Sequence, residues 1–295
     1  MWWVTRRWRV AFAQELRRRA RPLPGPGGTE VLTIAPVPLA EVARLFGLAL
    51  REAEVRAIEE RVLPERYLRN LGLFGWEGQR RLLESCVAVV GCGGLGGYVI
   101  EALARSGVGR LIVIDGDAFV PHNLNRQLLS SLATLGQAKA EAARQRVSLV
   151  NPAVEVQAHT VVGTAETLPE LLRGAQVVVD ALDTPRDRLI LEDVAAAIGI
   201  PLVHGAIAGA LGQVTTVFPG ERTLTALYGG SETVERGAEA LLGTPAMTPM
   251  LVAACQVGEV LKVLLNWGKP LRGRLLYLDL ESGNVEQFAL GQPGV

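Results

Sequence analysis

The chain of 295 residues is 49% hydrophobic and carries 30 basic and 30 acidic side chains. This length and apolar content suffice for one large domain, with or without an appendage, to bury a core without disulfides or metal. A formal net charge of zero argues against the whole protein binding nucleic acid or an acidic membrane surface. No apolar run approaches the roughly 20 residues needed to span a bilayer, so neither kind of partner is expected.

The number and spacing of the cysteines argue against a zinc site and against a disulfide framework. Cys86, Cys92 and Cys255 lie far apart, with no Cys-x-x-Cys pair and no histidine at ligand spacing. We therefore expect no zinc site, no disulfide framework, and a cytoplasmic protein with reduced thiols. Lysine is also scarce, and Lys139 is one of only three, which favours a chemical role for it.

The first 61 residues are predicted to be an N-terminal extension, and residues 62–295 the main domain. The Arg- and Trp-rich stretch 1–21 is a basic arm for a partner or an acidic surface, a frayed extension, or a misplaced translation start. The Pro/Gly-rich stretch 22–28 indicates a linker. Over 38–61, apolar residues at helical spacing predict an amphipathic helix, or a helix pair, that packs on the main domain.

From Cys86 onward, strand and helix signals alternate. Val87–Val90 is a continuous apolar run, typical of a parallel strand that is buried on both faces. Gly107 suits the left-handed end of the helix that follows. The alternation predicts a Rossmann-like, doubly wound α/β fold with a mostly parallel sheet and an antiparallel C-terminal edge. Further strands are expected at 111–114, 154–158, 177–181, 202–203, 214–218 and 274–280, and further helices at 138–150, 167–173, 185–198 and 251–265.

A glycine-rich loop, Gly91-Cys92-Gly93-Gly94-Leu95-Gly96, joins the first of these strands to its helix. Small residues let the backbone approach a phosphate, and the N-terminus of the helix supplies unpaired N–H groups. Asp115, at the end of the next strand, can accept hydrogen bonds from ribose hydroxyls. The loop alone favours an NAD-dependent oxidoreductase.

A polar cluster after the second strand changes this interpretation. Asn123, Arg126 and Gln127 follow that strand, and Lys139 begins the next helix. A dinucleotide needs no further cationic cluster, whereas a triphosphate with about four negative charges does. The alternative is an ordinary solvated loop, but four such side chains in a short window favour ATP.

Two aspartates follow the apolar run 177–179. A carboxylate at the carboxyl end of a strand, facing a triphosphate, is a natural Mg²⁺ ligand. Either aspartate could instead cap the helix that begins near Pro185. We favour Asp183 as the metal ligand and Asp180 as a structural residue.

An ordered series of motifs resembles the ThiF/MoeB/HesA family, whose members are relatives of the ubiquitin-activating enzymes. The resemblance covers residues from about 65 to 290. The motifs are Arg66-Tyr67-Leu68-Arg69, Glu77-Gly78-Gln79, Gly91–Gly96, Asp115–Asp117, Asn123–Gln127, Gly136–Lys139, Asp180–Asp183, Pro201–Val203 with Gly205, and Gly212-Gln213-Val214.

The resemblance implies an adenylyltransferase that binds ATP and Mg²⁺. Such an enzyme attaches AMP to the C-terminal Gly-Gly carboxylate of a ubiquitin-like sulfur-carrier protein and releases pyrophosphate. It also implies a homodimer, because Arg69 matches an arginine that reaches into the partner subunit's nucleotide site. The implied roles are ribose binding for Asp115, phosphate binding for Asn123, Arg126, Gln127 and Lys139, charge stabilisation for Arg126 and Lys139, and Mg²⁺ binding for Asp183.

The chain departs from the family at its cysteines. Many members carry two Cys-x-x-Cys pairs for zinc and a cysteine in a crossover loop, but this sequence has no such pair and no cysteine over 231–247. We therefore expect no covalent thioester there, and sulfur delivered by a separate protein. Thr184 replaces the family's usual Asn after the metal-binding Asp, and His122 and His204 are weaker candidates for substrate contact.

Three alternatives to adenylation of a carrier stay open. The first is an inactive family member that only docks a carrier, which the missing cysteines favour and the retained phosphate-binding residues oppose. The second is adenylation of another acceptor: a small molecule, a peptide or a tRNA base. The third is the NAD-dependent oxidoreductase that the glycine loop alone indicates.

Overall fold

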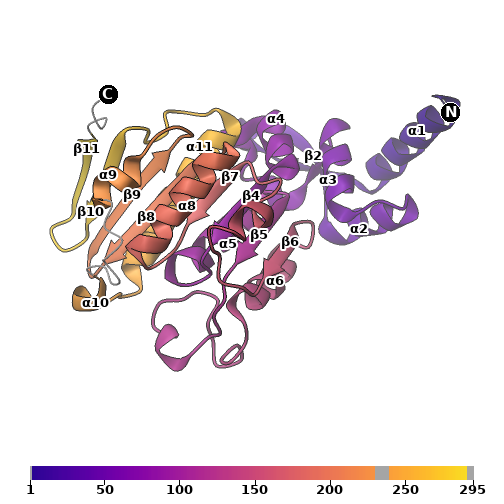
Figure 1. Cartoon of the computed structure of the whole chain (residues 1–295). Helices are drawn as coiled ribbons and strands as arrows, with labels where there is room; N and C mark the ends of the chain where they lie inside the picture. The colour runs from indigo at the N-terminus through magenta and orange to yellow at the C-terminus, as the bar shows by residue number, and fades with distance from the viewer. Residues whose placement is uncertain (1, 230–238, 291–295) are drawn as a thin grey trace.

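The computed structural model describes residues 2–229 and 239–290. These residues form two parts: an eight-stranded sheet covered by helices, and a smaller N-terminal unit (Figure 1). The strands are β1 (Arg21–Pro24), β2 (Glu30–Ile34), β3 (Leu63–Pro64), β4 (Cys86–Val90), β5 (Arg110–Ile114), β6 (Glu155–His159), β7 (Val177–Asp180), β8 (Leu202–Ala208), β9 (Leu211–Val217), β10 (Arg274–Asp279) and β11 (Asn284–Ala289). The α-helices are α1 (Trp2–Arg19), α2 (Pro36–Leu45), α3 (Leu50–Glu59), α4 (Leu71–Glu84), α5 (Gly94–Ser106), α6 (Lys139–Val150), α7 (Leu168–Leu171), α8 (Pro185–Ile198), α9 (Thr223–Tyr228), α10 (Glu239–Leu242) and α11 (Met247–Leu265).

The large sheet has the strand order β11-β10-β9-β8-β7-β4-β5-β6. The strands from β6 to β8 pair in parallel, whereas β9, β10 and β11 extend the sheet by antiparallel pairing. This order confirms the doubly wound, mostly parallel α/β fold with an antiparallel C-terminal edge. The edge strand is β11, so β10, the strand expected at 274–280, lies one position inside the edge.

Strand β4 shows how the sheet divides the core. Val87 and Val89 belong to the cluster that α5 and α11 cover, whereas Ala88 and Val90 belong to the cluster that α7 and α8 cover. All five residues of β4 are buried, because helices pack on both faces of a parallel sheet. Gly107 ends α5 with a φ of 86°, as its position in the sequence predicts.

Helix α11 bears on the expectation that no apolar segment approaches the length of a membrane span. Within residues 2–229 and 239–290 it is the one helix long and apolar enough to cross a membrane. Its apolar residues pack against the sheet, and two buried polar residues bond inside the protein. Gln256 donates to the Asp180 carbonyl oxygen at 2.8 Å, and Glu259 accepts from the Thr216 hydroxyl at 2.6 Å. Such buried polar bonds suit a core helix.

The N-terminal unit contains a small sheet where the sequence predicts a linker. Residues 21–24 form β1, which pairs antiparallel with β2, and β2 pairs in parallel with β3. The linker prediction is therefore wrong for these residues. Pro22 and Pro24 are tolerated because β1 is an edge strand with one neighbour, and the Thr33 hydroxyl donates to the Arg21 carbonyl oxygen at 3.0 Å.

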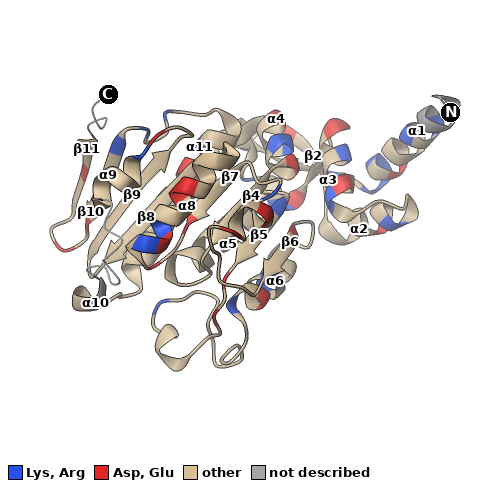
Figure 2. Ribbon diagram, viewed as in Figure 1, with Lys and Arg blue, Asp and Glu red and all other residues tan. Residues whose placement is uncertain are grey.

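The Arg- and Trp-rich stretch is a helix that packs on this unit. Phe12 and Leu16 of α1 are buried in one cluster with residues of α2 and α3. At the C-terminal end of α1, Arg17 pairs with Glu60 and Arg19 pairs with Glu41, so basic bands on α1 lie beside acidic groups (Figure 2). Residues 8–19 are therefore not a frayed extension, and their use as a basic arm for a partner stays a prediction. The helix or helix pair predicted over 38–61 is the pair α2 and α3.

A buried carboxyl group joins the N-terminal unit to the main domain. Glu54 of α3 is fully buried and accepts a hydrogen bond from the Tyr67 hydroxyl at 2.8 Å. That hydroxyl in turn accepts from the Asn151 amide, beyond α6, at 3.0 Å. Burial raises the pKa of Glu54 to about 7, even though Arg66, 3.5 Å away, and the Tyr67 bond both act to lower it.

This carboxyl group should make folding stability depend on pH. Protonated Glu54 contributes stability that is fully present below 4.5, its ordinary pKa, and is lost as pH rises through about 7. The loss is on the order of 3 kcal/mol, because each pKa unit corresponds to about 1.4 kcal/mol. We expect Glu54→Gln to flatten the pH dependence of the free energy of unfolding by that amount, measured by urea denaturation.

The exposed Glu30→Gln variant is the control, since its side chain lies on the surface. It should keep the wild-type pH dependence. Identical pH profiles for Glu54→Gln and the wild-type protein would contradict the prediction.

Candidate nucleotide site

A cavity of about 460 Å³ opens at the carboxyl ends of β4, β5 and β7. Ligands bind at this edge of the sheet in doubly wound folds. The cavity also includes Asp117, Asp187 and Arg188, to which the sequence analysis assigns no role. The predicted site residues that line it are Gly91, Gly93, Gly94, Asp115, Arg126, Gln127, Lys139 and Asp183.

The glycine loop needs its glycines for different reasons. Gly91 has a φ of 95°, and a Cβ atom there would lie 2.5 Å from the Ala181 carbonyl oxygen. Gly93 and Gly94 line the cavity where α5 begins, so the first N–H groups of that helix are available to an anion. Gly96 does not line the cavity, because a Cβ atom there would lie 1.8 Å from the Gly91 oxygen. This glycine allows close packing between the loop and the helix, and its contact with the cofactor stays a prediction.

Asp115 anchors the loop from the end of β5. Its Oδ2 accepts from the Cys92 N–H at 2.7 Å, and its Oδ1 accepts from the Asp117 N–H at 2.8 Å. Burial raises the pKa of Asp115, although these bonds and Lys139 act to lower it. Each carboxylate oxygen can accept a further bond, so ribose binding stays a prediction that this geometry permits.

Lys139 is held at the cavity by a carboxylate that sequence reasoning missed. Its Nζ lies 2.8 Å from Asp117 Oδ2, and its backbone N–H donates to the Asp117 carbonyl oxygen at 2.9 Å. The lysine side chain is 8% exposed, whereas that of Asp117 is 71% exposed. The Asp-x-Asp spacing was visible in the sequence, but only the folded chain shows that the second aspartate meets the lysine.

Asn123 lies in the turn that precedes Arg126 and Gln127. It lies in the 3-10 turn η3 (Pro121–Asn123), is 4% exposed, and does not line the cavity. Its Oδ1 accepts from the Val120 N–H at 3.0 Å. Asn123 thus shapes the turn that carries Arg126 and Gln127, because an Asn side chain readily bonds to nearby backbone. Its phosphate contact stays a prediction.

Arg126 and Gln127 do reach the cavity. Arg126 donates from Nη1 to the His122 carbonyl oxygen at 2.9 Å and to Asn125 Oδ1 at 2.8 Å. Burial lowers the pKa of Arg126, and the charge of nearby Asp183 opposes this. Gln127 Oε1 is buried without a hydrogen-bond partner among the described residues. A buried orphan acceptor at a cavity wall is typical of a site whose ligand supplies the missing donor.

Asp180, the last residue of β7, and Asp183, three residues later, lie in different surroundings. Asp180 is fully buried, and its Oδ2 lies 2.7 Å from His204 Nδ1. Asp183 is exposed and lines the cavity. The geometry thus keeps Asp183 as the candidate metal ligand and Asp180 as a structural residue. His204 is fully buried and does not line the cavity, so it is no candidate for direct substrate contact.

Thr184 is the N-cap of α8 and bonds to a further carboxylate that lines the cavity. Its hydroxyl accepts from the Asp187 N–H at 3.2 Å and donates to Asp187 Oδ2 at 2.7 Å. Asp187 lines the cavity beside Asp183. No group of three or more His, Cys, Asp or Glu in the described ranges could hold a metal alone, so a cation here would take further oxygen ligands from water or a bound molecule.

Two other candidates lie away from the cavity. Arg69 is exposed just before α4, and His122 is exposed in the turn η3. Neither lines the cavity. The predicted reach of Arg69 concerns the site of a second chain and stays a prediction.

A groove of about 210 Å³ adjoins the nucleotide cavity. Arg188 and Ile207 line both spaces. Small residues of β8 and β9, Ala206, Ala208 and Gly212, form part of its wall. Tyr228 and Tyr277 also line the groove. The remaining lining residues are Pro185, Leu211 and Gln213.

Comparison with known proteins defines the family. Residues 67–294 match the ThiF family. The chain belongs to the ThiF family. A SAMP-activating enzyme E1 of Haloferax volcanii is 40% identical over 220 residues, which are 73% of this chain and 81% of the relative. A sulfur carrier protein adenylyltransferase of Thermus thermophilus is 39% identical over 226 residues, which are 73% of this chain and 83% of the relative.

Solved structures agree with this assignment at the level of fold. Escherichia coli MccB with ATP has a TM-score of 0.67 and 22% identity, over 78% of this chain and 73% of MccB. PaaA has a TM-score of 0.65 and 23% identity, over 77% of this chain and 82% of PaaA. The family resemblance that the motifs predict is confirmed, and the chain is an adenylyltransferase of the ThiF/MoeB type.

Proposed function

We propose that this ThiF-family enzyme uses ATP and Mg²⁺ to adenylate the C-terminal Gly-Gly carboxylate of a ubiquitin-like sulfur-carrier protein. The observation that carries the proposal is the cavity lined by Arg126 and Lys139, which shares Arg188 and Ile207 with a groove walled by small residues. A relative that is 40% identical is named a SAMP-activating enzyme E1, and one that is 39% identical is named a sulfur carrier protein adenylyltransferase.

The cavity residues suit a magnesium–ATP complex. The N-terminus of α5 and the side chains of Arg126 and Lys139 would bind phosphates. Gln127 Oε1, which has no donor among the described residues, would accept from the nucleotide. Asp183 and Asp187 would hold Mg²⁺ together with phosphate oxygens, and the ion when bound would offset the charge of the leaving pyrophosphate.

The reaction itself needs positioning and charge neutralisation from this chain. A carboxylate oxygen of the acceptor attacks the α-phosphorus. The bond between the α-phosphorus and the oxygen that bridges it to the β-phosphorus breaks, and pyrophosphate leaves with the electron pair of that bond. Arg126 and Lys139 would stabilise that developing charge. Lys139 would exchange its Asp117 partner for phosphate, which costs little because Asp117 is already 71% exposed to water.

The groove suits an extended tail without side chains. Ala206, Ala208 and Gly212 leave room beside the backbone of β8 and β9, so consecutive glycines would fit where larger residues would not. A Gly-Gly tail lying there would bring its carboxylate to Arg188, at the border of the cavity.

We further propose that this chain makes the acyl-adenylate and forms no thioester in its crossover segment. No cysteine occurs over 231–247, of which residues 231–238 lie outside the described part. Cys86 and Cys92 are buried, and burial raises the pKa of each thiol. Sulfur would then come from a separate protein.

Pyrophosphate exchange tests the proposal. Purified enzyme, Mg²⁺, ATP and labelled pyrophosphate are incubated with each small carrier ending in Gly-Gly from the same genome. Exchange that depends on one carrier, and is lost when its last glycine is deleted, is the expected result. ATP binding without exchange for any carrier would indicate a different acceptor or a docking role.

The proposed homodimer predicts rescue between two inactive variants. Arg69→Ala and Lys139→Ala should each be inactive alone, whereas their mixed dimer should contain one site with both residues intact. In an equimolar mixture after subunit exchange, about one site in four should then be active. The measurement is carrier-dependent exchange, with each variant alone as the control. Activity no higher than in the separate variants would contradict a role for Arg69 across the interface.

A further inference from the structure

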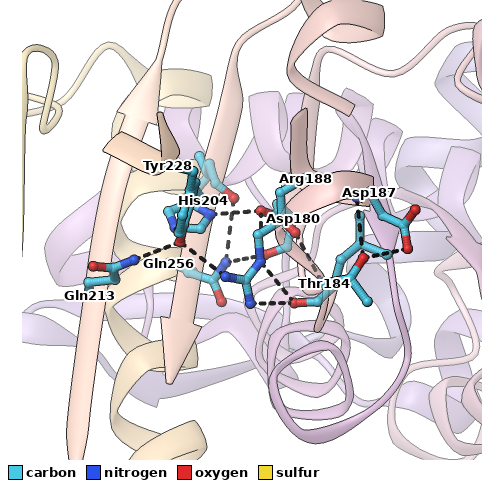
Figure 3. Close-up of polar contacts among 10 residues, drawn as sticks. Asp180, Thr184, Asp187, Arg188, His204, Gln213, Tyr228 and Gln256 are labelled. Carbon is cyan, nitrogen blue, oxygen red and sulfur yellow. Dashed lines mark hydrogen bonds and ion pairs between the residues drawn. The ribbon is translucent and has the colours of Figure 1, made fainter. Parts of the chain in front are cut away.

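Buried and half-buried polar side chains form an array beside the nucleotide cavity, which Arg188 lines (Figure 3). Its centre is the Tyr228 hydroxyl, which lies 3.0 Å from Arg188 Nη1, 2.7 Å from Gln213 Nε2 and 3.1 Å from His204 Nε2. His204 Nδ1 continues the array to Asp180 Oδ2 at 2.7 Å. Asp180 and His204 are fully buried, and the mechanism above uses neither of them.

The donors in this array fix where its protons lie. Arg188 and Gln213 both donate to the Tyr228 oxygen, so the hydroxyl proton must point to His204 Nε2. His204 then carries its own proton on Nδ1 and donates it to Asp180. The ring is therefore neutral, in agreement with burial, which lowers the pKa of His204 although Asp180 acts to raise it. A single proton arrangement makes the array rigid.

Both ends of the array close on the backbone of one residue. Asp180 Oδ1 accepts from the Leu182 N–H at 2.9 Å. Arg188 donates to the Leu182 carbonyl oxygen from Nη2 at 2.8 Å and from Nε at 3.3 Å. The next residue is Asp183, the candidate metal ligand. The array thus fixes both backbone polar atoms that precede the carboxylate in the cavity.

We propose that His204 and Tyr228 are positioning residues for the metal site. They act through Asp180 and Arg188 on Leu182, and so hold the Asp183 carboxylate toward the metal–nucleotide complex. The inference rests on the proposed magnesium–ATP site. A purely structural role explains less, because a buried polar array gives no more stability than an apolar core of the same shape. This array instead converges on the loop that bears Asp183.

The array also reaches the acceptor groove. Tyr228 and Arg188 both line it, and Arg188 lines the nucleotide cavity as well. An acceptor tail in the groove would therefore contact the same side chains that hold the metal-binding loop.

The test measures how strongly Mg²⁺ improves nucleotide binding, which is a readout separate from catalysis. Affinity for a fluorescent ATP analogue is determined in EDTA and in excess Mg²⁺ for each full-length protein. We expect the wild type to gain at least about 10-fold in affinity from Mg²⁺, and Asp183→Asn to gain almost nothing. Tyr228→Phe should lose about 3- to 10-fold of the gain while keeping its affinity in EDTA.

Tyr98→Phe is the matched control, because it removes a partly buried hydroxyl that has no hydrogen-bond partner among the described residues. It should keep the full gain. His204→Asn retains a donor toward Asp180 but cannot reach Tyr228, so it should show an intermediate gain in affinity from Mg²⁺. This variant replaces Tyr228→Phe if thermal unfolding shows that Tyr228→Phe is misfolded. A wild-type gain in both variants would overturn the positioning role alone. No gain in the wild type would overturn the proposed magnesium–ATP site, and the inference with it.

Discussion

Lys139→Ala should lower carrier-dependent ATP–pyrophosphate exchange by about 10²- to 10³-fold, the loss typical for removal of one preorganised charge donor. The lysine is a nearly buried cation of the cavity, with Nζ 2.8 Å from Asp117 Oδ2. Its removal takes a positive charge from the place where we propose that pyrophosphate leaves. The fold should persist, because the unpaired Asp117 carboxylate stays hydrated.

Lys269→Ala provides the matched control for this variant. Lys269 is exposed, beyond the end of α11, and far in sequence from the cavity residues. Its loss should leave exchange and the melting temperature unchanged. Exchange by Lys139→Ala within about twofold of the wild type would remove the proposed phosphate role of Lys139.

Asp183→Asn should lower the rate at saturating Mg²⁺ by about 10²-fold or more, because metal binding supplies several kcal/mol of charge stabilisation. The concentration of Mg²⁺ needed for half-maximal exchange should rise as well. Asn keeps the shape and one oxygen ligand of Asp but removes the negative charge, so the change tests charge and not volume. Exchange rates measured across a Mg²⁺ titration report both effects.

Glu170→Gln serves as the control, since it removes a carboxylate from the exposed surface of α7. It should behave as wild type throughout the titration. An unchanged Mg²⁺ requirement in Asp183→Asn would move the metal assignment to Asp187, the neighbouring carboxylate that lines the cavity.

Much of the fold could be predicted because its signals are local. The unbroken apolar run at Val87–Val90 indicates a strand that is buried on both faces. The glycine at position 107 indicates the end of a helix, and neither signal depends on the rest of the chain. The hairpin of β1 and β2 gave no such signal, because two prolines within four residues are typical of linkers. Pairing with residues 30–33 overrides that local preference, and pairing is not visible in composition.

The candidate site was predictable as a set of motifs but not as a set of contacts. Motif position correctly brings Arg126, Gln127 and Lys139 to one cavity. It cannot tell whether an amide such as that of Asn123 faces a ligand or caps its own turn, since both uses suit an Asn in a loop. The Tyr228–Arg188 contact joins residues 40 positions apart, so it depends on how α9 packs against α8.

The charges around the cavity determine which form of the nucleotide can enter. Among the described residues of this chain, its walls carry three basic side chains, Arg126, Lys139 and Arg188, against four acidic ones, Asp115, Asp117, Asp183 and Asp187, so the formal charge of these side chains is one negative. Uncomplexed ATP, itself an anion, would meet repulsion that the basic groups do not cancel. A divalent counter-ion that arrives with the nucleotide reverses the balance. The enzyme should therefore discriminate between free and magnesium-bound ATP at the binding step, before any chemistry begins.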